Sequence, residues 1–136
     1  SVSFNVAPPD GWGGTTARIC DDLVSLGDSF AALRTWDLLQ SLRALDEWGG
    51  VQTGALSLFL HGKVGIYGAL ASVLEPRLKI DLWEEPLPSY REVTLSRRYD
   101  PEGLKPCVIP GLLAYADWTD LLPACRKESP DYGTHL

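Results

Sequence analysis

The residues 61-HGKVG-65 have the clearest chemical potential in the chain, because they join an apolar run to a segment rich in small residues. A strand, a tight turn and a closely packed helix have this pattern. In enzymes with a G-x-S-x-G motif the residue at the tip of such a turn is the nucleophile. The tip position here is Gly62, which has no atom that can attack a substrate. Glycine tolerates the positive φ that the tip requires, so the sequence predicts the turn without its nucleophile.

Two candidates for acid–base chemistry accompany the turn. His61 adjoins the tip, and Glu84 follows the next apolar segment, where its carboxylate could orient a histidine. A base that serves neither a nucleophile nor an oxyanion site gives only modest acceleration. The interpretation we favour is therefore that His61 bonds across the turn and Glu84 is a solvated loop acid.

The glycines around the turn also allow a second kind of site. Gly62, Gly65 and Gly68, with acidic residues about twenty positions further on, superficially meet the template for dinucleotide binding. That fingerprint requires G-x-G-x-x-G, and Val64 stands at its second glycine. Lys63 also lacks the following Ser or Thr of a phosphate-binding loop. Close packing of a helix on a sheet explains the same glycines, and nucleotide or phosphate binding stays an alternative.

The sequence predicts a long helix over residues 29–48, ahead of the turn. Leucines recur in it at helical spacing, Asp28 or Ser29 can cap its start, and Gly49-Gly50 ends it. This helix is the first of the elements that would position the turn.

A strand, a helix and a second strand are expected around the turn itself. Residues 56–60 are apolar with one exception, which is typical of a central strand covered on both faces. A helix over 64–74 and a strand over 78–83 follow, and this order predicts a right-handed crossover and a parallel sheet. Further on, prolines break the chain into loops and short turns, with brief helices expected over 111–115 and 119–122.

A set of candidate binding residues follows from the expected edge of the sheet. Alternation predicts a strand over residues 2–6, and the glycine-rich residues 10–16 predict a loop at its carboxyl end. Open α/β sheets bind ligands outside the carboxyl ends of their strands. Trp12 and Trp118 lie near predicted loops, where they could line a pocket. The candidate binding residues are Trp12, Gly13, Lys63 and Trp118.

Length and composition indicate one α/β domain over residues 1–125 with a loose tail over 126–136. The chain has 136 residues, of which 45% are hydrophobic, enough to form a core. A net charge of −6 without a basic patch argues against a nucleic-acid or anionic-membrane partner. No segment has the length of a membrane span and the N-terminus lacks a signal-peptide pattern, so a soluble chain is expected, with no compartment assigned.

Three cysteines, Cys20, Cys107 and Cys125, are widely spaced and form no C-x-x-C pair. Reduced thiols are the expectation, with a disulfide or a metal site as the alternative. No pattern in the sequence calls for a cofactor or a metal ion.

Four stretches of the chain together resemble a known family. They are 10-DGWGGT-15, 26-LGDSFAALRTWDLLQSLRAL-45, 60-LHGKVG-65, and 84-EEPLPSY-90 with 109-IPGLLAYADWTDLLPA-124. They are similar to segments of the α/β-hydrolase superfamily, in particular the acetyl xylan esterase-like and dipeptidyl-peptidase-like hydrolases. The chain departs from the family at Asp10, where the family usually has an arginine, and at Gly62, where the family has its nucleophilic serine.

The resemblance implies a fold and a lineage. It implies a small three-layer parallel sheet with flanking helices, like the central part of an α/β-hydrolase core, and a protein of carboxylesterase or acetyl esterase lineage. Of the family's functional residues, only the nucleophile position can be matched to this chain. It lies at the tip of the strand-to-helix turn, which is called the elbow, and here it is Gly62. The acid and the histidine of the triad normally follow the matched segment, so an incomplete triad is expected. A non-catalytic binding or assembly module is the alternative.

Partners follow from the same resemblance. A small ester or a carbohydrate is the ligand that the lineage implies. A partial sheet would also have an unpaired strand edge, and such edges tend to find partners. We therefore expect either a homo-oligomer or a second chain that completes the sheet.

Overall fold

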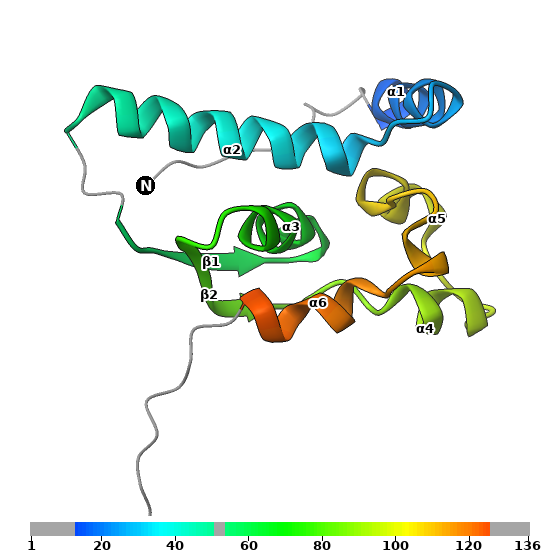
Figure 1. Cartoon of the computed structure of the whole chain (residues 1–136). Helices are drawn as coiled ribbons and strands as arrows, with labels where there is room; N and C mark the ends of the chain where they lie inside the picture. The colour runs from blue at the N-terminus through cyan, green and yellow to red at the C-terminus, as the bar shows by residue number, and fades with distance from the viewer. Residues whose placement is uncertain (1–12, 51–53, 126–136) are drawn as a thin grey trace, which may run out of the picture.

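The computed structural model describes residues 13–50 and 54–125, in which helices pack against a two-stranded parallel sheet (Figure 1). The helices and strands, in chain order, are α1 (Gly13–Ser25), α2 (Phe30–Trp48), β1 (Leu56–His61), α3 (Ile66–Leu74), β2 (Leu78–Glu84), α4 (Tyr90–Leu95), α5 (Pro101–Leu104) and α6 (Trp118–Cys125). The described ranges also contain three short 3-10 helices, η1 (Lys63–Gly65), η2 (Lys105–Cys107) and η3 (Leu112–Ala114). The parallel β1–α3–β2 unit confirms the predicted crossover.

The long helix α2 begins and ends where the sequence predicts. The hydroxyl of Ser29 accepts a hydrogen bond from the Ala32 amide at 3.0 Å, and the Asp28 carboxylate accepts one from the Ser29 amide at 2.7 Å. At the other end Gly49 has a left-handed conformation with φ of 66°, and its amide donates to the Leu45 carbonyl. These caps satisfy backbone groups that a helix leaves unpaired at its ends.

The two strands pair in parallel with one irregularity. The register runs from Leu56 opposite Leu78 to His61 opposite Glu84, and a bulge between Leu58 and Phe59 makes the register step past Asp81. The extra residue shifts the alternation of β2, so that Ile80 and Trp83 both pack against apolar residues of the covered face. The bulge therefore turns the Trp83 ring toward the helices.

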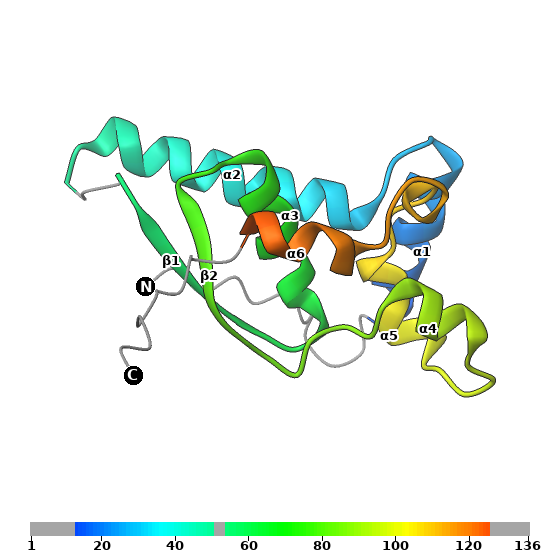
Figure 2. The same ribbon diagram turned by 60° about the horizontal axis from the view of Figure 1, so that its bottom comes forward.

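Among the described residues, the helices cover one face of the sheet (Figure 2). Inward side chains of both strands join two apolar clusters with α2, α3 and α6. On the other face Phe59 is 73% exposed. The prediction of a strand covered on both faces is therefore wrong for β1. The three layers expected from the hydrolase resemblance are also not found in the described ranges, and the strand predicted over 2–6 lies outside them.

The first helix contradicts one prediction. Residues 10–16 were expected to form a loop, but α1 begins at Gly13, while residues 10–12 lie outside the described part. The helix is held by the core, because Cys20 is buried in the largest apolar cluster, and by an ion pair between Asp21 and Lys105 at 3.3 Å. Of the later elements, η3 and α6 confirm the brief helices expected over 111–115 and 119–122. The predicted tail over 126–136 lies outside the described residues.

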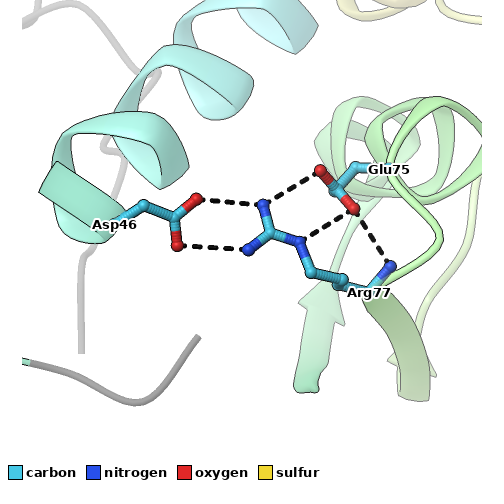
Figure 3. A network of polar contacts seen from close by, with 3 residues as sticks. All are labelled: Asp46, Glu75 and Arg77. Atoms are coloured by element: carbon cyan, nitrogen blue, oxygen red, sulfur yellow. Dashed lines mark hydrogen bonds and ion pairs between the residues drawn. The ribbon is translucent and has the colours of Figure 1, made fainter. Parts of the chain in front are cut away.

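A network of charges ties the end of α2 to the turn between α3 and β2 (Figure 3). The guanidinium of Arg77 donates two hydrogen bonds to the Asp46 carboxylate, at 3.1 and 3.0 Å. It also donates two to the Glu75 carboxylate, both at 3.0 Å. These bonds hold the pKa of Glu75 below its ordinary value of 4.5.

Replacing Arg77 tests this network. We expect Arg77→Ala to lower the melting temperature by a few degrees, and high salt to reduce the difference, because the pairs are partly solvated. A lowered pKa of Glu75 means that the stabilisation is present above pH 4.5 and is lost as the pH falls through the folded-state pKa. Thermal scans should therefore show the wild-type and variant curves converging in acid. Arg97→Ala, at an exposed loop position, is the control, and an equal loss in both variants would contradict the prediction.

Candidate functional site

The turn after β1 has the conformation predicted for an elbow tip. Gly62 has φ of 68° and ψ of −175°, and its amide donates to the Glu84 carbonyl at 2.9 Å. Its carbonyl accepts from the Gly65 amide at 3.1 Å and from the Trp83 indole at 3.0 Å. A Cβ atom at Gly62 would meet nothing within 4 Å, so the tip opens into free space although the backbone there favours glycine.

The next two glycines serve packing. A Cβ atom at Gly65 would lie 2.5 Å from Nε1 of Trp83, and one at Gly68 would lie 2.6 Å from Cδ2 of Leu60. Both glycines therefore face the sheet and allow α3 and η1 to approach it closely. This explains the glycine spacing without a bound nucleotide, and it supports the packing interpretation.

The structure brings His61 and Glu84 together at the carboxyl ends of the strands. Nδ1 of His61 lies 3.6 Å from Oε2 of Glu84, and its Nε2 lies 4.0 Å from Oε2 of Glu85. These distances exceed a hydrogen bond, and the His61 side chain is 72% exposed. Glu85 has a positive φ of 50°, which is uncommon for a residue with a side chain. The three groups form an open, solvated cluster beside the turn.

The four candidate binding residues do not converge. The Lys63 ammonium lies 3.2 Å from the Asp100 carboxylate. Trp118 is only 4% exposed, its indole donates to the Pro88 carbonyl at 3.2 Å, and its ring lies 4.8 Å from that of Trp83. Trp118 is therefore a core residue here and does not line an open pocket. Gly13 begins α1, and Trp12 lies outside the described residues.

A thiol close to the turn does not replace the missing serine. Sγ of Cys107 lies 3.7 Å from the Lys63 carbonyl, but the residue is 1% exposed. Burial raises the pKa of this thiol to about 11, so it stays protonated near neutral pH and is a poor nucleophile. Cys20, Cys107 and Cys125 are all buried, and none of them takes part in a disulfide within the described residues.

Sequence reasoning missed Asp117, which organises the region next to Trp83. The residue is fully buried, and its carboxylate accepts hydrogen bonds from the amides of Tyr90 at 3.1 Å, Arg91 at 2.9 Å and Trp118 at 2.8 Å. It therefore joins the first residues of α4 and α6. The available signal was its place two residues before the helix predicted over 119–122, close to the position where aspartate is a favoured cap.

A groove of about 490 Å³ lies on another part of the surface, between α4, α5 and η2. It is lined by Tyr90, Val93, Thr94, Tyr99, Pro101, Leu104, Lys105 and Val108. None of the predicted site residues belongs to this lining, so the groove is separate from the turn.

The fold and the turn define a mixed α/β protein with a glycine-tipped strand–turn–helix unit. No protein-family model, curated protein or solved structure matches the chain. Within residues 13–50 and 54–125 no helix has the length and apolar character needed to cross a membrane. In the same ranges no three His, Cys, Asp or Glu side chains are grouped so as to hold a metal ion.

Proposed function

We propose that this chain is a hydrolase-related protein of carboxylesterase or acetyl esterase lineage that has no complete catalytic triad of its own. The observation that carries the proposal is the turn at Gly62. Its tip has a positive φ, lies at the carboxyl end of β1, opens into free space and precedes a helical segment. These are the features that an elbow needs to expose a nucleophile, and the nucleophile itself is missing.

The surrounding groups support a loss of catalysis. The Cys107 thiol is buried and protonated, and His61 with Glu84 lies in a solvated cluster without a nucleophile to activate. General-base catalysis without a nucleophile or an oxyanion site is weak. The chain alone would then act by binding, with a small ester or a carbohydrate as the ligand that its lineage implies.

Ester turnover tests the proposed loss of catalysis. We expect the purified chain to hydrolyse p-nitrophenyl acetate no faster than the variant His61→Ala at equal concentration. The matched comparison cancels cleavage by all other surface groups, and free imidazole at the same concentration measures the background expected from the exposed His61 side chain. Turnover by the wild type that disappears in His61→Ala and in Glu84→Gln would contradict the proposal and would assign those residues a catalytic role.

Restoring a hydroxyl at the tip tests the proposed lineage. We expect Gly62→Ser to react with a fluorophosphonate at least about tenfold faster than Gly49→Ser, measured as covalent labelling by mass spectrometry. The first N–H groups of a helical segment point toward its N-terminal side, where they can stabilise the negative oxygen that forms during attack. Gly49 is the matched control, since it also has a positive φ and open space around the Cβ position but lies at the C-terminal end of α2. Equal labelling of both serines would overturn the elbow assignment.

A further inference from the structure

We propose that the uncovered face of the sheet is a self-complementary interface through which two copies of this chain form a two-fold dimer. The inference does not rest on the proposed function. This outer face, as we call it, consists of Ser57, Phe59 and His61 of β1 with Lys79, Leu82 and Glu84 of β2, which are paired in that order across the strands.

The centre of the outer face carries an apolar pair, with the exposed Asp81 of the bulge next to it. Phe59 and Leu82 are paired in the sheet register and are 73% and 48% exposed. Parallel sheets are almost always covered on both faces, because the helices that connect parallel strands lie against those faces. Aromatic residues such as phenylalanine are enriched in protein interfaces, so the exposed ring of Phe59 is a suitable central contact.

The charges at the two ends of the outer face are opposite. Lys79 lies toward the start of β2, opposite Ser57, and Glu84 lies at its end, with Glu85 following. The Lys79 ammonium donates to the Ala124 carbonyl at 3.1 Å, and an ammonium group has three donors. Along β2 the order is Lys79, Asp81, Leu82 and Glu84, so the apolar pair lies between Lys79 and Glu84, with the exposed Asp81 carboxylate on the Lys79 side.

This order of charges selects a second copy as the occupant. A two-fold axis parallel to the sheet and perpendicular to the strands, passing over Phe59 and Leu82, makes the strands of the two copies run in opposite directions. Lys79 of each copy then faces Glu84 of the other, and the apolar centres meet. An isologous contact needs such a self-complementary patch, with cation and carboxylate on opposite sides of the axis.

The first experiment measures native mass by light scattering over a range of concentrations. We expect the wild type to be a dimer and Phe59→Asp to raise the dissociation constant at least about tenfold. Leu95→Asp is the control, because Leu95 is 86% exposed at the end of α4, away from the outer face. A wild type that is monomeric at every concentration would overturn the proposal, as would a dimer that tolerates Phe59→Asp.

A charge-reversal experiment tests the two-fold arrangement. Lys79→Glu places two acidic residues at each end contact, and Glu84→Lys places two basic residues there, so each variant alone should dimerise more weakly than the wild type. An equimolar mixture of the two variants should form heterodimers, and the double variant should regain the wild-type dimer. Failure of the mixture to associate more tightly than either variant alone would overturn the arrangement. So would a monomer in which residues 1–12 of the same chain cover this face.

Discussion

Asp117→Ala is expected to lower the free energy of unfolding by about 3–5 kcal/mol. The carboxylate is fully buried and accepts hydrogen bonds from three backbone amides, of Tyr90, Arg91 and Trp118. An alanine would leave these donors without their acceptor in a region closed to bulk water. An unsatisfied buried donor costs about 1–3 kcal/mol, and three donors share this one acceptor group.

Urea unfolding followed by tryptophan fluorescence measures the effect of Asp117→Ala. Asp117→Asn should lose less stability, because the asparagine side chain keeps one oxygen that can accept hydrogen bonds from the backbone N–H groups. Asp22→Ala, at an exposed position of α1, should stay within about 0.5 kcal/mol of the wild type. A loss below about 1 kcal/mol for Asp117→Ala would mean that water or a shifted backbone satisfies the three donors.

The elements with strong local signals could be predicted from the sequence. Helix α2 has a serine cap and a glycine stop, and the β1–α3–β2 unit has apolar runs of the right lengths. Helix α1 could not be predicted, because its two leading glycines disfavour a helix. Its buried Cys20 and the ion pair of Asp21 with Lys105, distant in sequence, outweigh that local preference.

Which faces of the sheet are covered also could not be predicted from local sequence patterns. Phe59 belongs to an apolar run typical of a strand buried on both faces, yet it is exposed. Its burial depends on which other segments pack on that face, and the hydrophobic periodicity of the strand carries no information about those segments. The exposed Phe59 is thus a property of the tertiary arrangement. The same fact makes the outer face a candidate interface.

The backbone conformation of the candidate site could be predicted from the sequence, whereas the side chains around it could not. The positive φ of Gly62 follows from the residue type and its place between a strand and a helix. Asp117 could not be assigned its partners, since Tyr90 and Arg91 lie 27 and 26 positions earlier in the chain. Trp118 was placed near a pocket because it lies beside a predicted loop, whereas its contact with Trp83 puts it in the core.

Gly65→Ala should lower the free energy of unfolding by about 1–3 kcal/mol, since it overpacks the contact between η1 and the sheet. The added Cβ would lie 2.5 and 2.8 Å from two atoms of the Trp83 indole and 3.1 Å from Cβ of Leu60. The indole has little freedom to move, because it donates to the Gly62 carbonyl and packs on Trp118. Relief of the clash must therefore disturb either the Trp83 contact or the turn.

The matched control for this prediction is Gly54→Ala, because a Cβ at Gly54 would meet nothing within 4 Å and the residue has no positive φ. This variant should be as stable as the wild type or slightly more stable, since alanine restricts the unfolded chain. Trp83→Phe in the Gly65→Ala background should recover part of the loss if the clash with the indole is its cause. Equal stability of Gly65→Ala and Gly54→Ala would instead mean that the indole moves without cost. The hydrogen bond from Trp83 to Gly62 would then not be what holds the turn in its elbow conformation.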